Sequence, residues 1–404
     1  MAMKESGIEW VGSIPDTWDV IPNKYIMHKE KNLCEKWTGE DVMSLTMNGV
    51  IVRDLQNPTG KMPATFDGYQ YIEDGDLLMC LFDIDVTPRC IGKVTHNGVT
   101  SPAYSNFKTH DNASRDYYYY YYLMVDNTKE LLHLAKNLRH SFTEEQLGSL
   151  KVPMPPLTEQ QVIADYLNEK CSKIDDIIAE ANASVEEYKE LKQAVIDNAT
   201  MTGIHDSEMK YTDYVWFPEM PKSWNLVLAS LLFREDVRPI DANDVSLSLS
   251  QVDGLIPTDD MSERSLKSAT HDNWKHVIPD DLVLNRFKGH LGVFFASKYT
   301  GMVSFHYGVY HAIRDDVYAK YYEYLFHSTT YKNIFALKSN GITVGLQNLS
   351  NGNFYSVKIL HPTLDEQIEI VKYLDKRIAE IDSLLAEKES LINDLEAYKK
   401  SLIY

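Results

Sequence analysis

The chain has 404 residues, 44% of them hydrophobic and 25% charged, which predicts a globular protein with two or more domains. The formal net charge of −19 excludes a strongly basic nucleic-acid-binding domain. No apolar run is long enough to span a membrane, the N-terminal residues do not resemble a signal peptide, and the four cysteines form no CxxC pair. We therefore expect a cytoplasmic protein without membrane contact and without a metal site.

Residues 1–153 are predicted to form a globular domain of mixed α/β type. Short strands are expected at 76–79, 92–95 and 99–101, the last two joined by an Asn-Gly turn. The six consecutive tyrosines at 117–122 predict either a buried strand with one wet edge or the start of a helix.

A long helix is predicted for residues 154–203. Apolar residues alternate by four and three positions along it, with charged residues between them, which is typical of a coiled-coil seam. The seam consists of Leu167, Cys171, Ile174, Ile178, Ala181, Val185 and Tyr188. Thr158 and Gln161 have the spacing of a capping box, and the Asn, Thr and Gly residues at 198–203 predict the end of the helix.

The second half of the chain repeats the first. Glu159 recurs as Glu366, and each seam position keeps the same displacement (366 − 159 = 207). The repeat predicts a second globular domain at 204–360, with a strand at 281–284. Two further strands are expected in it at 294–296 and 302–305, joined by a Tyr-Thr-Gly turn.

A second long helix is predicted for residues 361–404. Its seam consists of Leu374, Ile378, Ile381, Leu385, Lys388, Ile392 and Leu395. Thr363 and Glu366 have the spacing of a capping box at its start. Lys388 stands where the first helix has Ala181, and a lone polar residue on a seam can fix the register and the partner.

Two apolar stripes in one chain are most simply explained if the helices pack on each other. We therefore expect two α/β (α+β) domains in a pseudo-twofold tandem repeat, with long helices that pair as an antiparallel coiled coil. Each helix would reach ~60 Å at 1.5 Å per residue. The alternative is two separate helices, each packed on its own domain. The segments 156–200 and 363–404 hold net charges of −6 and −4, so a local basic face on each globular part remains open.

Motifs of common enzymes are absent from the sequence. It contains no P-loop, no GxGxxG, no HExxH and no GxSxG. The nearest nuclease-like fragment includes Tyr188, which lies on the seam, so a solvated helix face explains it better. His306 and His311 have the chemistry of metal ligands, but ordinary core or surface histidines are far more common. We expect a non-catalytic chain.

Two motifs occur twice and in the same order. The segments KVPMPPLTEQ at 151–160 and VKILHPTLDEQ at 357–367 each precede a long helix. The segments IPDTW at 14–18 and MPKSW at 220–224 each open a globular domain. In these features the chain resembles the specificity subunits of type I restriction-modification systems, over essentially its whole length. The second copy keeps the pattern but has His361-Pro362-Thr363 where the family usually has Pro-Pro.

The resemblance implies a non-catalytic subunit that binds double-stranded DNA. In that family, two target recognition domains each read one half of a split sequence, and the helices set the gap between the halves. The helices also dock two methyltransferase subunits, which carry S-adenosylmethionine, so no cofactor is expected in this chain. Restriction/translocation subunits of the same system join to cut unmodified DNA. The family's chain usually continues past the last helix, whereas this sequence ends at Tyr404.

Candidate site residues follow from the resemblance and from side-chain chemistry. In the family, the loop after the strand at 76–79 faces DNA, which corresponds here to 82–93 and, in the second domain, to 285–290. Arginine and lysine can pair with guanine or phosphate, and asparagine with adenine. The candidate DNA-contact residues are Thr46, Asn48, Thr87, Arg89, Lys93, Lys108, Ser250, Gln251, Arg264, Lys267, Asn285, Arg286, Lys288 and His290. The candidates for subunit docking and helix pairing are Glu159, Gln160, Tyr166, Leu167, Ile174, Ile178, Glu366, Gln367, Tyr373, Leu374, Ile381 and Leu385.

Two other functions stay open at this point. One is a coiled-coil scaffold with two protein-binding domains and no DNA role, which the overall charge of −19 favours. The other is an enzyme that acts alone. The two repeated motifs favour the DNA-reading subunit over both.

Overall fold

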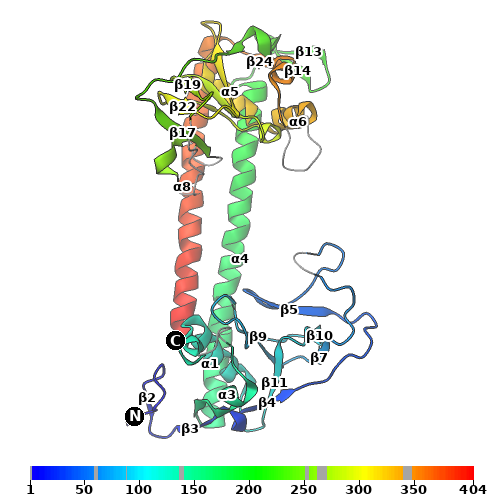
Figure 1. Ribbon diagram of the computed structural model, residues 1–404, viewed down its shortest axis with the longest axis vertical. Coiled ribbons are helices and arrows are strands. Elements are labelled where there is room, and N and C mark those ends of the chain that lie inside the picture. The colour runs from blue at the N-terminus through cyan, green and yellow to red at the C-terminus, as the bar shows by residue number, and fades with distance from the viewer. Residues whose placement is uncertain are drawn as a thin grey trace. The chain divides into compact units, whose positions relative to one another are not determined.

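Figure 1 shows the computed structural model, which describes residues 2–58, 62–87, 89–135, 141–250, 254–261, 271–339 and 348–404. The chain divides into two compact units: Met1–Ala181 with Ser390–Tyr404, and Asn182–Glu389. Each unit contains one globular part and a segment of both long helices. The domain boundaries at 153, 203 and 360 stay predictions. Within the described residues, no helix is long and apolar enough to cross a membrane.

The first unit is built on two small sheets. Its described strands are β1 (Met3–Glu5), β2 (Ser13–Pro15), β3 (Asp19–Pro22), β4 (Met27–Glu30), β5 (Val42–Thr46), β6 (Gly49–Val52), β7 (Gln70–Ile72), β8 (Leu77–Met79), β9 (Ile91–Lys93), β10 (Gly98–Thr100), β11 (Ser105–Thr109) and β12 (Lys151–Met154). The sheets have the orders β6-β5-β10-β7 and β4-β11-β8-β9, and β1-β2 and β12-β3 form separate pairs. Its described helices are η1 (Asn23–Tyr25), α1 (Arg115–Asn127), α2 (Glu130–Leu134) and α3 (Glu144–Ser149).

The second unit repeats this topology strand for strand. Its described strands are β13 (Met209–Tyr214), β14 (Phe217–Pro221), β15 (Asn225–Leu228), β16 (Phe233–Glu235), β17 (Val245–Ser250), β18 (Gly254–Pro257), β19 (Lys275–Val277), β20 (Leu282–Asn285), β21 (Phe294–Ala296), β22 (Gly301–Val303), β23 (Tyr307–Ala312) and β24 (Lys358–His361). The sheets have the orders β18-β17-β22-β19 and β16-β23-β20-β21, with the pairs β13-β14 and β15-β24. One parallel contact recurs, β5 with β10 and β17 with β22. The described helices are η2 (Ala229–Leu231), η3 (Thr258–Asp260), η4 (Gly289–Leu291), α5 (Ala319–Phe326), α6 (Thr329–Lys338) and α7 (Asn351–Tyr355). The predicted tandem repeat of α/β domains is confirmed.

The predicted strands exist, and the turns predicted between them join strands of different sheets. The strands expected at 76–79 and 281–284 are β8 and β20. The strands joined by short turns do not pair with each other: β9 pairs with β8, whereas β10 pairs with β7 and β5. Likewise β21 pairs with β20, and β22 with β19 and β17. Each turn carries the chain from one sheet to the other.

The run of tyrosines forms a helix, which was the second of the two alternatives. The Ser114 hydroxyl caps the start of α1 by accepting a hydrogen bond from the backbone N–H of Tyr117. Tyr118 is completely buried in the core of the first unit, which also contains Leu167 and Cys171 of the following long helix. The aromatic rings therefore fix the globular part to the long helix by burial of apolar surface.

The long helices are α4 (Leu157–Thr202) and α8 (Leu364–Ile403), the two longest ribbons in Figure 1. In the second unit, Lys192 donates to Asp382 at 2.6 Å, and the His205 ring lies 3.2 Å from the carboxylate of Glu369. From the first pair to the second, the residue number of one partner rises by 13 (from 192 to 205), whereas that of the other partner falls by 13 (from 382 to 369). The chains run antiparallel there, and the predicted antiparallel pairing is confirmed.

The first unit contains the repeat-related contact between the same helices. Lys399 of α8 donates to both carboxylate oxygens of Asp175 of α4, at 2.5 and 2.6 Å. A displacement of 207 residues converts Asp175 into Asp382 and Lys192 into Lys399, so one ion pair occurs twice (382 − 175 = 207; 399 − 192 = 207). Ile403, in the last turn of α8, is buried in the core of this unit.

The two helices begin differently. At α8 the predicted capping box is confirmed: the hydroxyl of Thr363 donates to Glu366 at 2.7 Å and accepts from its backbone N–H at 3.4 Å. The capping box predicted at Thr158 is wrong, because Gln161 instead donates to a carboxylate one turn further along the helix. Pro156 stands where the second copy has Thr363, and proline has no side-chain group to cap a helix.

Candidate nucleic-acid interface

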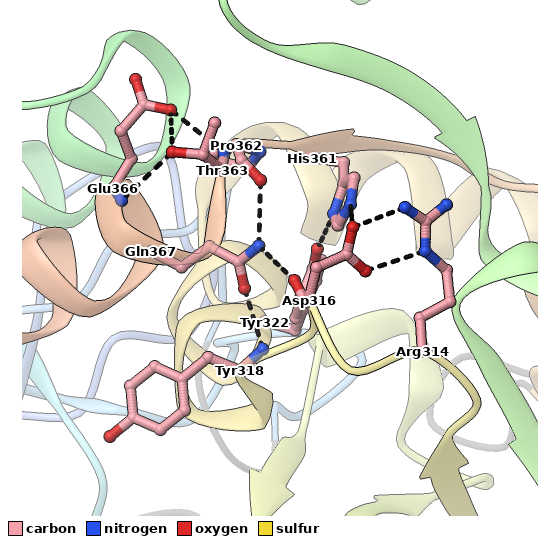
Figure 2. A network of polar contacts seen from close by, with 9 residues as sticks. All are labelled: Arg314, Asp316, Tyr318, Tyr322, His361, Pro362, Thr363, Glu366 and Gln367. Carbon is pink, nitrogen blue, oxygen red and sulfur yellow. Dashed lines mark hydrogen bonds and ion pairs between the residues drawn. The ribbon is translucent and has the colours of Figure 1, made fainter.

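A buried glutamine at the start of α8 binds three backbone groups of its unit (Figure 2). Gln367 accepts from the backbone N–H of Tyr318 at 2.8 Å. Its side-chain amide donates to the carbonyl oxygens of Asp316 and Pro362 at 2.9 and 3.0 Å. The side chain is completely buried, so these bonds fix the segment before α5 against the start of the long helix.

Gln160 of α4 makes the same three contacts in the first unit. It accepts from the backbone N–H of Ser114 at 2.7 Å. It donates to the carbonyl oxygens of Asn112 and Pro155 at 3.4 and 2.8 Å. Buried polar groups are costly unless they are paired, so both glutamines serve the internal structure of their units.

The glutamate before each glutamine reaches the tryptophan of the opening motif. The indole N–H of Trp18 donates to Glu159 at 2.7 Å, and that of Trp224 donates to Glu366 at 3.2 Å. The repeated Glu-Gln pair therefore ties the helix start to the first strands and to the segment before the tyrosine helix. A docking role for these four residues stays a prediction.

Tyrosine hydroxyls add a second pair of equivalent ties. Tyr120 donates to Asn168 of α4 at 3.0 Å, and Tyr324 donates to Asp375 of α8 at 2.5 Å. Asn168 and Asp375 are again 207 residues apart (375 − 168 = 207). Each globular part is therefore held to its helix by matching polar contacts as well as by the aromatic core.

His361, which stands where the first copy has Met154 (361 − 154 = 207), joins a polar network in the second unit (Figure 2). Its Nδ1 lies 2.5 Å from the hydroxyl of Tyr322, and its Nε2 lies 3.2 Å from Asp316. Arg314 donates to the same carboxylate, and this bond, together with His361, lowers the pKa of Asp316 to about 2. His361 therefore links the hydroxyl of Tyr322 to the carboxylate of Asp316.

Most of the apolar residues predicted for docking and pairing are inside the fold. The buried ones are Leu167, Ile174, Leu374 and Ile381, and the half-buried ones are Ile178 and Leu385. Tyr166 and Tyr373, in contrast, are exposed. Seam residues occupied by the fold have little surface left for a further protein, so the exposed positions are the better docking candidates.

A second apolar stripe lies along one flank of each long helix and is exposed. We call it the flank stripe. On α4 it consists of Tyr166, Ile177 and Leu191, and on α8 of Tyr373, Leu384, Leu391 and Tyr398. Spacings of seven, eleven and fourteen residues return to nearly the same flank of a helix. Of these residues, only Tyr166 and Tyr373 were predicted from the sequence, although the second set of near-heptad apolar positions was a readable signal.

Three of the DNA-contact candidates in the first unit line one cavity. Thr46, Thr87 and Arg89 surround a space of about 250 Å³ together with Met47 and Phe82. The Thr46 hydroxyl also donates to the Gly49 carbonyl at 3.0 Å. The cavity thus combines a guanidinium, two hydroxyls and exposed apolar side chains.

The other candidates of the first unit are dispersed. Lys93 forms an ion pair with Asp116 of α1 at 3.3 Å. Lys108 donates to Glu73 at 2.8 Å, a bond that raises its pKa. Asn48 is exposed in the turn between β5 and β6. Their DNA contacts stay predictions.

In the second unit, Arg286 is committed to an internal polar cluster. Its Nη2 donates to Glu235 at 2.5 Å and to Asn351 at 2.7 Å, and only 22% of the side chain is exposed. Lys275 donates to the same carboxylate at 2.7 Å. Although burial lowers it, the pKa of Arg286 is raised by Tyr310 and Glu235. A DNA contact by Arg286 stays a prediction, one that would require these bonds to be exchanged.

The remaining candidates of the second unit that the structure describes lie at the ends of strands or shortly after them. Asn285 ends β20 and is half-buried, and Lys288 is exposed in the next turn. Ser250 ends β17 and has partners within the fold. Three candidates lie outside the described residues, namely Gln251, Arg264 and Lys267. The side chain of His290 also lies outside them. Among the residues that the structure describes, no group of three or more His, Cys, Asp or Glu side chains could hold a metal ion.

Comparisons with known proteins agree with this architecture. The family model described as "Type I restriction modification DNA specificity domain" matches residues 84–187 and 257–393, more than half of the chain. A chain from "Structural basis underlying complex assembly and conformational transition of the type I R-M system" is 13% identical, with 96% of this chain and 97% of that chain covered and a TM-score of 0.67. The HsdS subunit from Thermoanaerobacter tengcongensis is also 13% identical, with 96% of both chains covered and a TM-score of 0.50. At this identity the solved structures show a shared fold.

Proposed function

Since the chain belongs to the family of type I restriction modification DNA specificity domains, we propose that it selects the DNA sequence on which such a system acts. Each globular part reads one half of a split double-stranded sequence, and the chain itself makes and breaks no covalent bond. The observation that carries the proposal is the strand order, which is identical in the two units. The loops after β8 and β20 differ in length and charge, so one scaffold presents two different surfaces.

Side-chain chemistry supports DNA reading in both loops. In the first unit, Arg89 in the cavity has the donor pair that fits the O6 and N7 atoms of guanine. Thr46 and Thr87 supply hydroxyls that bond to base edges or phosphates. In the second unit, Lys288 is exposed and Asn285 lies beside it, which suits contacts with phosphate and adenine.

The flank stripe supports a docking role for the helices. Tyr166, Ile177, Leu391 and Tyr398 lie in the first unit, and Tyr373 in the second is the repeat counterpart of Tyr166. Two equivalent apolar patches suit two copies of one partner. We assign this partner to the methyltransferase subunit, which would carry S-adenosylmethionine, with restriction/translocation subunits joining the same cytoplasmic complex.

A selection experiment tests DNA reading. The chain is co-expressed with the methyltransferase of its own system, and the complex is incubated with a library of random duplexes. We expect the retained duplexes to share two short motifs separated by a gap of constant length. Methyl transfer from labelled S-adenosylmethionine is expected for the complex on such duplexes, and none for the purified chain alone.

The alternatives give different results. A complex that forms but retains no duplex sequence above the input library would support the coiled-coil scaffold. Methylation or cleavage by the purified chain would contradict the division of labour. A single contiguous motif would contradict the assignment of one half-sequence to each unit.

Docking is tested by charge substitution in the flank stripe. Tyr166→Glu and Tyr373→Glu should each remove one methyltransferase subunit, because a carboxylate in an apolar interface must be desolvated. Native mass spectrometry counts the bound subunits: two for the unchanged chain, one for each single variant and none for the double variant. Tyr211→Glu is the control, since Tyr211 is exposed on β13 and outside both helices. Two bound subunits in the double variant would exclude the flank stripe as the docking surface.

A further inference from the structure

An exposed phenylalanine follows the same strand in both units. Phe82 comes shortly after β8 and Phe287 shortly after β20, and they have the displacement of the strands themselves (287 − 82 = 205; 282 − 77 = 205). The exposed fractions are 36% for Phe82 and 40% for Phe287. The neighbouring residues differ between the copies, so an aromatic ring at this point is the feature that the two loops share.

In the first unit, the ring of Phe82 belongs to an open apolar surface beside a cation. It lines the cavity of about 250 Å³ together with Met47, Arg89 and Tyr104. Met47, in the turn between β5 and β6, is also exposed. An apolar face and a guanidinium are therefore presented at one place.

In the second unit, Phe287 belongs to a small aromatic cluster. Its ring centroid lies 5.0 Å from that of His306, which lies 3.8 Å from that of Phe305. Phe305 is 51% exposed. The cluster forms because Tyr307, the first residue of β23, pairs with the last residue of β20, which brings the two turns together. Lys288 is exposed next to the cluster.

Single exposed apolar residues are normal on protein surfaces, but an exposed aromatic ring beside a cation at a repeated position is not explained in that way. A nucleobase presents a π-face within a polyanionic backbone, and aromatic rings with nearby cations suit that combination. We propose that Phe82 and Phe287 each stack against DNA at one base step of the half-sequence that their unit reads. This inference rests on the proposed function. The polar contacts distinguish one base from another, whereas the aromatic contact would tolerate different bases.

The proposal predicts a distinctive dependence on salt. Stacking buries an apolar face without neutralising a phosphate, so its loss should lower affinity at every salt concentration by the same factor. Loss of a lysine contact with phosphate should instead reduce the slope of log affinity against log salt by about 1. Phe287→Ala and Lys288→Ala therefore separate two contacts that are adjacent in one turn.

The affinity test uses the complex with its methyltransferase and a duplex of about 40 base pairs, chosen from random sequence by the unchanged complex. Phe82→Ala and Phe287→Ala should each weaken binding roughly 5- to 150-fold, the range for removal of one base–aromatic stack. The salt slope should not change. Phe82→Trp and Phe287→Trp should bind like the unchanged chain, because tryptophan also stacks. Tyr299→Ala is the matched control: Tyr299 is 40% exposed and lies beyond the far end of β21.

A fluorescent base locates the contact. With 2-aminopurine placed at successive adenines of the duplex, disturbed base stacking should raise the emission in each half-sequence when the complex binds. Phe82→Ala should remove the signal from one half only, and Phe287→Ala from the other half only.

The outcomes separate this inference from the proposed function. If the unchanged complex selects no duplex, the proposed function fails. If it selects a duplex but both Phe→Ala variants bind within twofold of it, the stacking proposal is wrong. Weaker binding together with loss of the methyltransferase, seen by native mass spectrometry, would also overturn it and assign the cluster to a protein partner.

Discussion

The substitution Gln367→Leu tests whether the repeated Glu-Gln pair holds each unit together. Leucine has a similar volume but can neither donate nor accept a hydrogen bond. The backbone N–H of Tyr318 and the carbonyl oxygens of Asp316 and Pro362 would lose their partner in a site from which water is excluded (Figure 2).

The expected magnitude follows from those three groups. A buried polar group without a partner costs about 1–3 kcal/mol, and small shifts that restore some bonding keep each cost in the lower part of that range. For the three groups together, we expect the free energy of unfolding to fall by about 3–6 kcal/mol. The free energy of unfolding of a natural domain is roughly 5–15 kcal/mol in total. The second unit should therefore lose a large share of its stability at 25 °C. Gln160→Leu should act on the first unit somewhat less strongly, because one of its bonds is 3.4 Å long.

Urea unfolding with hydrogen exchange measures this effect. Exchange should accelerate first at the segment before α5 in the Gln367 variant and before α1 in the Gln160 variant. Gln161→Leu is the control, since Gln161 is exposed and bonds only within its own helix. If Gln367→Leu and Gln161→Leu unfold at urea midpoints that agree within error, the pair is not a structural tie, and its repetition would need another cause, such as docking.

Three further results are expected from other variants. Because the pKa of Asp316 is about 2, its carboxylate stabilises the fold above pH ~4, and this contribution is lost as the pH falls from ~4 to ~2. Asp316→Asn should therefore reduce the fall in the free energy of unfolding between these pH values. A fall as large as that of the unchanged chain would contradict this reasoning. Tyr324→Phe and Tyr120→Phe should each cost about 1 kcal/mol in urea unfolding, and the absence of a cost in both would exclude the hydroxyl ties. A double-mutant cycle on Lys192 and Asp382 should give a coupling below ~1 kcal/mol, because both side chains are partly exposed, and a larger value would indicate a buried pair.

The fold could be predicted from sequence to the extent that the pattern is local or repeated. The displacement of 207 residues and the alternating seam were enough for the tandem units and the antiparallel helices. Strand positions followed from apolar runs and turns. Strand partners did not, because a turn sequence shows where the chain bends but not which sheet receives the next strand.

The site was harder to predict because its residues are defined by distant partners. Arg286 has the composition of a DNA reader, yet its carboxylate partner Glu235 lies 51 residues earlier in the chain. Gln160 and Gln367 were interpreted as docking residues because repetition alone does not distinguish a surface from an internal bond. The exposed rings of Phe82 and Phe287 could not be separated from core residues by type, since exposure is a property of the fold.

The position of Ile403 in the core of the first unit has a consequence for synthesis. Residues 390–404 complete a unit whose other residues, 1–181, leave the ribosome much earlier. While the second unit is being made, the core around Leu167 and Cys171 lacks its last apolar contact. The unit that is translated first should therefore be the last to close, and until then its exposed apolar surface makes the nascent chain sensitive to proteases and dependent on chaperones.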